Sequence, residues 1–119
     1  YQTEVDMITP IRRGQVCAGY SNHSDLAADQ WGNLYGAITR NDPGKASELL
    51  ICRRQHGTGV HASIAIFPAV GGIKYGYCSI AVVGAHLVVW ASERQLDGTT
   101  PQWEYLLPNA VTEFAPAEA

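Results

Sequence analysis

The sequence Val60-His61-Ala62-Ser63-Ile64-Ala65-Ile66-Phe67 alternates in character and gives the clearest indication of the fold. Successive side chains of a β-strand point to opposite faces of the sheet, so this alternation predicts a strand over 60–67. Pro68 follows and ends the strand, because proline has no N–H to donate to a neighbouring strand. One face of the strand is expected to carry Val60, Ala62, Ile64 and Ile66.

The segments on either side of this strand give further strand signals. Upstream, Ser47–Arg54 contains an apolar run and is separated from 60–67 by the turn-forming Gly57-Thr58-Gly59, which predicts a hairpin. Downstream, Ile73–Val83 and Ala85–Ser92 are rich in Tyr, Ile and Val and are joined across Gly84. A glycine within the first of these, Gly76, suggests a β-bulge.

Shorter strands are expected towards both ends of the chain. Asp97-Gly98 is a turn signal, and the strand Gln102–Leu107 follows it and stops before Pro108. We also interpret Ile11–Tyr20 as a strand weakened by its glycines, and Ala110–Phe114 as a further short strand.

The segment Ser24–Arg40 is ambiguous. At helical spacing its apolar residues form one stripe, which favours a short helix near 24–38. Gly32 and Gly36 oppose a helix, because each costs about 1 kcal/mol relative to alanine. The alternative is a turn at 30–33 followed by a strand at Leu34–Arg40. We favour a short helix or turn, followed by that strand.

The turn also carries a resemblance to a known motif. Asp29-Gln30-Trp31-Gly32-Asn33-Leu34-Tyr35 resembles the D-x-x-G-N-L-Y turn of β-propeller blades, in which Gly-Asn makes the turn and the next residues enter a strand. A propeller needs repeated blades, and the motif occurs once here. The resemblance therefore implies a turn followed by a strand.

Together these signals predict a mainly β fold. We expect a compact antiparallel sandwich or barrel-like domain of six to eight short strands, with room for one short helix near 24–38, or alternatively an α+β domain. The 119 residues fit one domain spanning 1–119, in which 115–119 form a frayed tail.

Composition limits the classes of partner. The net charge of −3 does not favour nucleic acid, and no apolar run is long enough to predict a membrane span. Charged residues make up 16%, against a usual ~25%, which indicates a surface hidden in an assembly or covered with small polar residues. Such surfaces are common in secreted and virion proteins, so these locations are slightly favoured.

The three cysteines, Cys17, Cys52 and Cys78, form no CxxC pair. We favour three reduced, buried cysteines, although an odd count requires only that one is free or paired between chains. The four histidines show no metal-ligand spacing, and we predict neither a metal site nor a cofactor.

Four residues are candidates for ligand binding. Tyr75 and Tyr77 lie two apart on one predicted strand and are therefore expected to share a face. Trp90 offers a flat apolar ring with a polar N–H, and Arg53 carries a planar guanidinium that suits contacts with a partner.

One resemblance implies a catalytic arrangement. Val16-Cys17-Ala18-Gly19-Tyr20 resembles the D-C-S-G motif of NlpC/P60-type peptidases, which implies Cys17 as nucleophile and His61, at the start of a later strand, as its base. The Asp and Ser of the motif are replaced here by Val16 and Ala18.

No catalytic motif stands out, so we favour a non-enzymatic binding or assembly module that binds a ligand or protein and self-associates. Expected partners are copies of the chain, another protein, or a small-molecule or carbohydrate ligand. A small Cys/His hydrolase is the alternative, and an immunity-type inhibitor of a partner enzyme is the second alternative.

Overall fold

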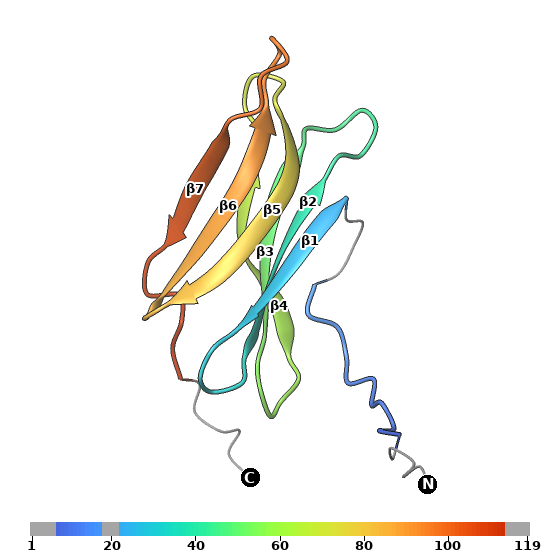
Figure 1. The fold of residues 1–119 in the computed structure, drawn as a ribbon, viewed down its shortest axis with the longest axis vertical. Helices are drawn as coiled ribbons and strands as arrows, with labels where there is room; N and C mark the ends of the chain where they lie inside the picture. The colour runs from blue at the N-terminus through green and yellow to red at the C-terminus, as the bar shows by residue number, and fades with distance from the viewer. Residues whose placement is uncertain (1–6, 18–21, 114–119) are drawn as a thin grey trace, which may run out of the picture.

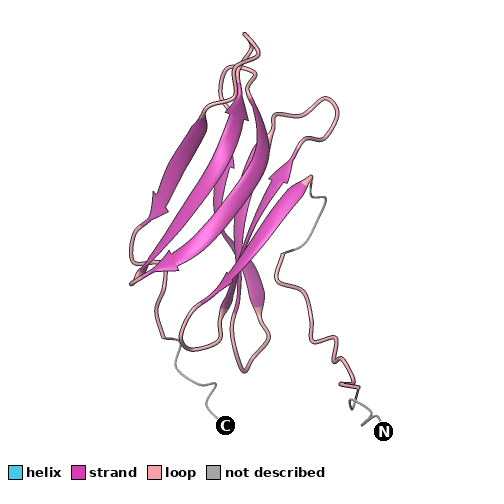
Figure 2. Cartoon of the chain, in the orientation of Figure 1, coloured by secondary structure: helices cyan, strands magenta, loops and turns pink. Residues whose placement is uncertain are grey.

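The computed structural model describes residues 7–17 and 22–113, and within these ranges it consists of strands and loops without a helix (Figures 1 and 2). The strands are β1 (His23–Ala28), β2 (Leu34–Arg40), β3 (Glu48–Arg54), β4 (His61–Pro68), β5 (Lys74–Val83), β6 (His86–Arg94) and β7 (Gln102–Leu107). The prediction of a mainly β fold is confirmed. No helix among the described residues is long and apolar enough to cross a membrane.

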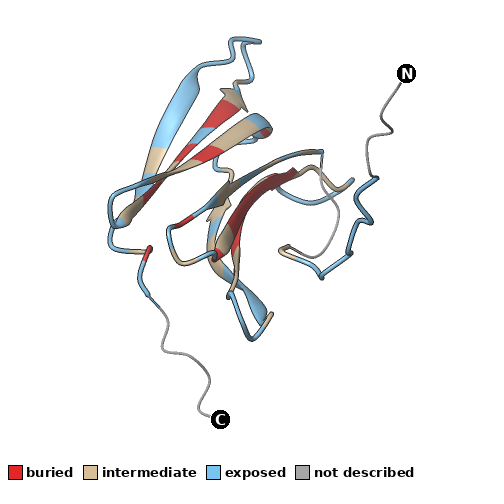
Figure 3. Cartoon of the chain, turned by 60° about the horizontal axis from the view of Figure 1, so that its bottom comes forward, coloured by how far each residue is buried: buried red, intermediate tan, exposed pale blue. Residues whose placement is uncertain are grey.

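The strands form two antiparallel sheets, each built from strands that are consecutive in the sequence. Sheet A has the order β1-β2-β3-β4, and sheet B has the order β5-β6-β7. The sheets lie one over the other, with β5 against β1 and β2 (Figures 1 and 3). At this contact Asp25 Oδ2 of β1 accepts hydrogen bonds from the Ser79 hydroxyl (3.2 Å) and the Ile80 amide (3.0 Å) of β5.

The main core lies between the two sheets, and both sheets carry buried segments (Figure 3). Tyr35, Leu49 and Ile51 enter it from sheet A, and Leu87 and Val89 enter it from sheet B. Burying large apolar side chains such as these stabilises the fold by about 1.5–3 kcal/mol each.

A second, smaller cluster lies on the outer side of sheet A. Ile38, Leu50 and Cys52 are buried there with Cys17 packed against them. Cys17 and Cys52 form a disulfide, with Cα atoms 5.5 Å apart, while Cys78 is free. The expectation of three reduced cysteines is therefore wrong for two of them, and the requirement for one unpaired thiol is met by Cys78.

The helix considered for 24–38 is absent, and β1, a turn and β2 take its place. Hydrogen bonds to the Asp29 carboxylate stabilise this turn. Oδ1 accepts hydrogen bonds from the backbone N–H groups of Trp31 and Asn33. Oδ2 accepts hydrogen bonds from the Asn33 side-chain amide and the Tyr35 hydroxyl. The side chain of Asp29 thus supplies acceptors that a helix would have to provide from its backbone. The turn followed by the strand at Leu34–Arg40 is confirmed.

Strand predictions after Ser47 are largely confirmed, including the β3–β4 hairpin, the β5–β6 hairpin across Gly84 (φ 61°) and β7. The predictions at the two ends are wrong: residues 11–17 and 110–113 form no strand. Residues 18–20, Phe114 and the predicted frayed tail at 115–119 lie outside the described residues.

A register shift also corrects the predicted faces of β4. Ser63 lies opposite Cys52 and Ala65 lies opposite Ile51, so Ile64 is an extra residue between them. One extra residue reverses the alternation beyond it. Ala62 and Ile66 therefore lie on opposite faces, not on one face as predicted.

Candidate functional site

A bulge in β5 organises the outer face of sheet B. Tyr75 lies opposite Glu93 and Cys78 lies opposite Ala91, so two residues of β5, Gly76 and Tyr77, face the single residue Ser92 of β6. Glycine is needed at the first position, because a Cβ on Gly76 would lie 2.6 Å from Ser92 Oγ. Without that Cβ, Ser92 Oγ accepts a hydrogen bond from the Tyr77 backbone N–H at 2.9 Å. The expected bulge at Gly76 is confirmed.

This bulge separates the two tyrosines that were expected to share a face. Tyr75 points into the core and is 4% exposed, whereas Tyr77 points outward and is 72% exposed. Burial raises the pKa of the Tyr75 hydroxyl, which lies 3.4 Å from the hydroxyl of Tyr105. The prediction of a shared face is wrong, and Tyr77 alone is available to a ligand.

Trp90 lies on the same outer face as Tyr77. On β6 it pairs with Ser79 of β5 and Glu104 of β7, and it is 45% exposed. Its indole Nε1–H donates to Glu104 Oε1 at 3.2 Å, which holds the ring in one orientation. The ring of Tyr77 packs against His23 of β1, with centroids 4.0 Å apart. Each exposed ring thus has a neighbouring side chain that supports its observed orientation.

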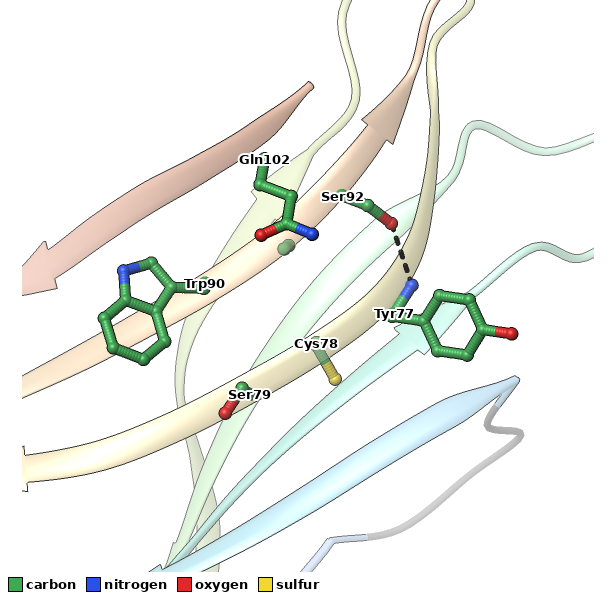
Figure 4. Close-up of a pocket in the computed structure, with 7 residues that line it drawn as sticks. Tyr77, Cys78, Ser79, Trp90, Ser92 and Gln102 are labelled. Atoms are coloured by element: carbon green, nitrogen blue, oxygen red, sulfur yellow. Dashed lines mark hydrogen bonds between the residues drawn. The ribbon is translucent and has the colours of Figure 1, made fainter. Parts of the chain in front are cut away.

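A shallow hollow lies between these rings (Figure 4). In this view the Gln102 side chain lies between the indole of Trp90 and the phenol of Tyr77, and the Ser79 hydroxyl lies below them. The amide and the hydroxyl add hydrogen-bonding groups beside two aromatic faces. The full lining is Tyr77, Cys78, Ser79, Trp90, Ala91, Ser92 and Gln102.

The lining carries no charged side chain. Cys78 contributes to the lining, but its side chain points towards sheet A, with Sγ 3.4 Å from the Ala37 carbonyl oxygen, and burial raises the pKa of its thiol to about 11. A thiol that stays protonated at neutral pH is a poor nucleophile. The Cys78 thiol is therefore not an activated nucleophile.

The other residues predicted from sequence lie elsewhere. Arg53 is on β3 in sheet A, opposite Tyr35, and takes no part in the hollow. Cys17 is bonded to Cys52, whereas a cysteine nucleophile needs a free thiol. His61 begins β4 and pairs with Arg54. Within the described ranges, no three His, Cys, Asp or Glu residues group in a way that could hold a metal ion.

Sequence reasoning missed the polar part of the site. Ser79, Gln102 and Glu104 come from two strands that flank β6, and only their register brings them beside Trp90. The alternation within Gln102–Leu107 was a usable signal, because it places Gln102 and Glu104 on one face. The alternation does not indicate which strand lies beside Gln102–Leu107 in the sheet.

Comparison with known proteins found no matching family model, no matching curated protein and no matching solved structure.

Proposed function

We propose that the protein is a non-enzymatic binding module and that the outer face of sheet B holds an uncharged saccharide. The observation that carries this proposal is the pair of exposed, fixed aromatic rings, Trp90 and Tyr77, on either side of a hollow with polar groups. The faces of sugar rings carry C–H groups that pack on aromatic faces, while their hydroxyls need donors and acceptors at the edges. The hollow offers both.

The electrostatics favour a neutral ligand. No Lys or Arg lines the hollow, and the chain carries a net charge of −3, so phosphate-bearing ligands gain little from this surface. The orientation of the two rings is set by Glu104 and His23, so binding costs little ordering of side chains. A neutral oligosaccharide meets both conditions.

The proposal is tested by titrating the protein with a panel of neutral gluco-, manno-, galacto- and N-acetylglucosamine oligosaccharides and following binding by calorimetry. We expect one class to bind. Trp90→Ala should weaken that binding by about ten- to thirtyfold, the loss typical of a central aromatic contact of ~1.4–2 kcal/mol.

Trp103→Ala is the matched control. Trp103 is an exposed tryptophan of the same sheet, but it pairs with the buried Ala91 and so lies on the opposite face from Trp90. It should bind like the parent protein. The proposal fails if no member of the panel binds at millimolar concentration, or if both variants lose affinity equally while both remain folded by circular dichroism.

A further inference from the structure

The segment before the disulfide is an exposed arm that carries three large apolar side chains. We define the arm as residues 7–15, all of which are exposed. Its large apolar side chains, Met7, Ile8 and Ile11, are 81–91% exposed. In Figure 1 the arm leaves the sheets and runs away from them. An apolar segment held in water in this way is typical of a surface that another chain covers.

The arm is fixed at its base and lies beside an apolar groove. The Cys17–Cys52 disulfide ties the chain to β3 on the outer side of sheet A. Next to this anchor, Val16, Leu26 and Ile38 line a groove along β1 and β2. Leu26 is 59% exposed there, although it belongs to a sheet face that is otherwise buried at its centre.

We infer that two copies of this chain exchange arms, so that residues 7–11 of each copy lie in the groove at Leu26 of the other. Each chain carries both the apolar donor and the apolar acceptor, which is what a two-fold, self-complementary contact requires. Ile11 is six residues from Cys17 and can reach about 20 Å from the anchor in an extended chain. Arms that start beside the groove can therefore cross to an equivalent groove on a neighbouring copy.

The charges of the arm and of the rest of the chain, and the surface area that the arms would bury, both support a second copy of this chain as the partner. Residues 7–17 contain Arg12 and Arg13 and no acid, a net +2, whereas residues 22–113 contain eight acidic and six basic residues, a net −2. A basic arm therefore meets an acidic body. Three large side chains per arm remove on the order of 300 Å² of apolar surface. Two arms and their two grooves give about 1,200 Å², the lower end of stable interfaces.

The test is the mass in solution by light scattering coupled to size exclusion, from about 5 to 100 µM. We expect twice the single-chain mass of 12.9 kDa. Arm residues make no core contact, so Ile8→Asp/Ile11→Asp should fold normally and weaken the dimer at least thirtyfold. Leu26→Asp should do the same from the acceptor side.

Ile66→Asp is the matched control, because Ile66 is 51% exposed on the same outer face but lies on β4, at the opposite edge of sheet A from Leu26. It should leave the dimer intact. A single-chain mass for the parent protein at 100 µM overturns the inference, as does a dimer that survives either arm or groove variant. Loss of the dimer in Ile66→Asp to the same extent also overturns it. Because the arm groove and the saccharide surface are on different sheets, failure of one leaves the other untouched.

Discussion

The contact between Gly76 and Ser92 predicts a non-additive pair of substitutions. Gly76 has no positive φ, so its backbone conformation is not one that only glycine favours, and the added methyl group is the main perturbation. Its Cβ would lie 2.6 Å from Ser92 Oγ but 3.9 Å from Ser92 Cβ. The conflict is therefore with one oxygen atom.

Either response to Gly76→Ala has a cost. If Ser92 rotates, Tyr77 N–H loses its acceptor at 2.9 Å, a loss of about 1 kcal/mol, and if it does not, overpacking costs about 1–3 kcal/mol. We expect a loss near 2 kcal/mol, or roughly 8 °C in Tm for a domain of this size. Ser92→Ala alone should cost about 1 kcal/mol.

The double variant shows whether the loss comes from the contact with Ser92 Oγ or from alanine being unfavourable at position 76 for another reason. With Ser92→Ala the nearest atom becomes a methyl at an ordinary distance, so the double variant should lose about 1 kcal/mol, not the ~3 kcal/mol of the sum. The assay is urea unfolding of all four proteins. Ser79→Ala, a hydroxyl of the same sheet face that makes no contact with position 76, serves as the control background and should be additive with Gly76→Ala. Additive losses in both backgrounds would show that the Ser92 hydroxyl is not the source of the conflict.

Two further predictions concern stability. Replacing Cys17 and Cys52 by serine opens a loop closed over a sequence separation of 35, so the free energy of unfolding in urea should fall by about 4 kcal/mol; a loss under 1 kcal/mol would contradict this. Burial alone would raise the pKa of Asp29, but hydrogen bonds from Asn33, Tyr35 and Trp31 outweigh it and lower the pKa below 3.8. The ionised carboxylate therefore contributes its full share of the folding stability above pH 3.8, and this share is lost as the pH falls through the lowered pKa. Asp29→Asn should lower stability at pH 7 by about 2–3 kcal/mol and flatten the acid limb of Tm against pH, whereas an unchanged limb would show that Asp29 does not set it.

The strands after Ser47 were predictable because alternation and turn residues are local properties. Val60–Phe67 and Gln102–Leu107 give their strands directly from this pattern. The faces were less predictable, since one extra residue at Ile64 or at Gly76 reverses every side chain beyond it. Of the four predicted ligand-binding residues, the structure brings Tyr77 and Trp90 to one hollow, while Tyr75 and Arg53 point elsewhere.

The remaining errors have the same kind of cause. The apolar residues of 24–38 do have helical spacing, but the Asp29 carboxylate accepts four hydrogen bonds that stabilise a turn instead. The spacing of apolar residues contains no information about such side-chain hydrogen bonds. The Cys17–Cys52 pairing joins residues far apart in sequence, and no spacing rule selects it over Cys78. Such contacts depend on which strands become neighbours, and this is a property of the assembled sheets.

The order of the strands has a consequence for how the chain reaches this structure. Both sheets are simple meanders, and among the described residues the chain passes between them only through 69–73, which link β4 to β5. Every ladder therefore closes a short loop, whose entropic cost is small. Each sheet can form from its own consecutive strands, so that the packing of the two sheets against each other comes last. This order of events favours faster folding than topologies whose neighbouring strands are far apart in the sequence.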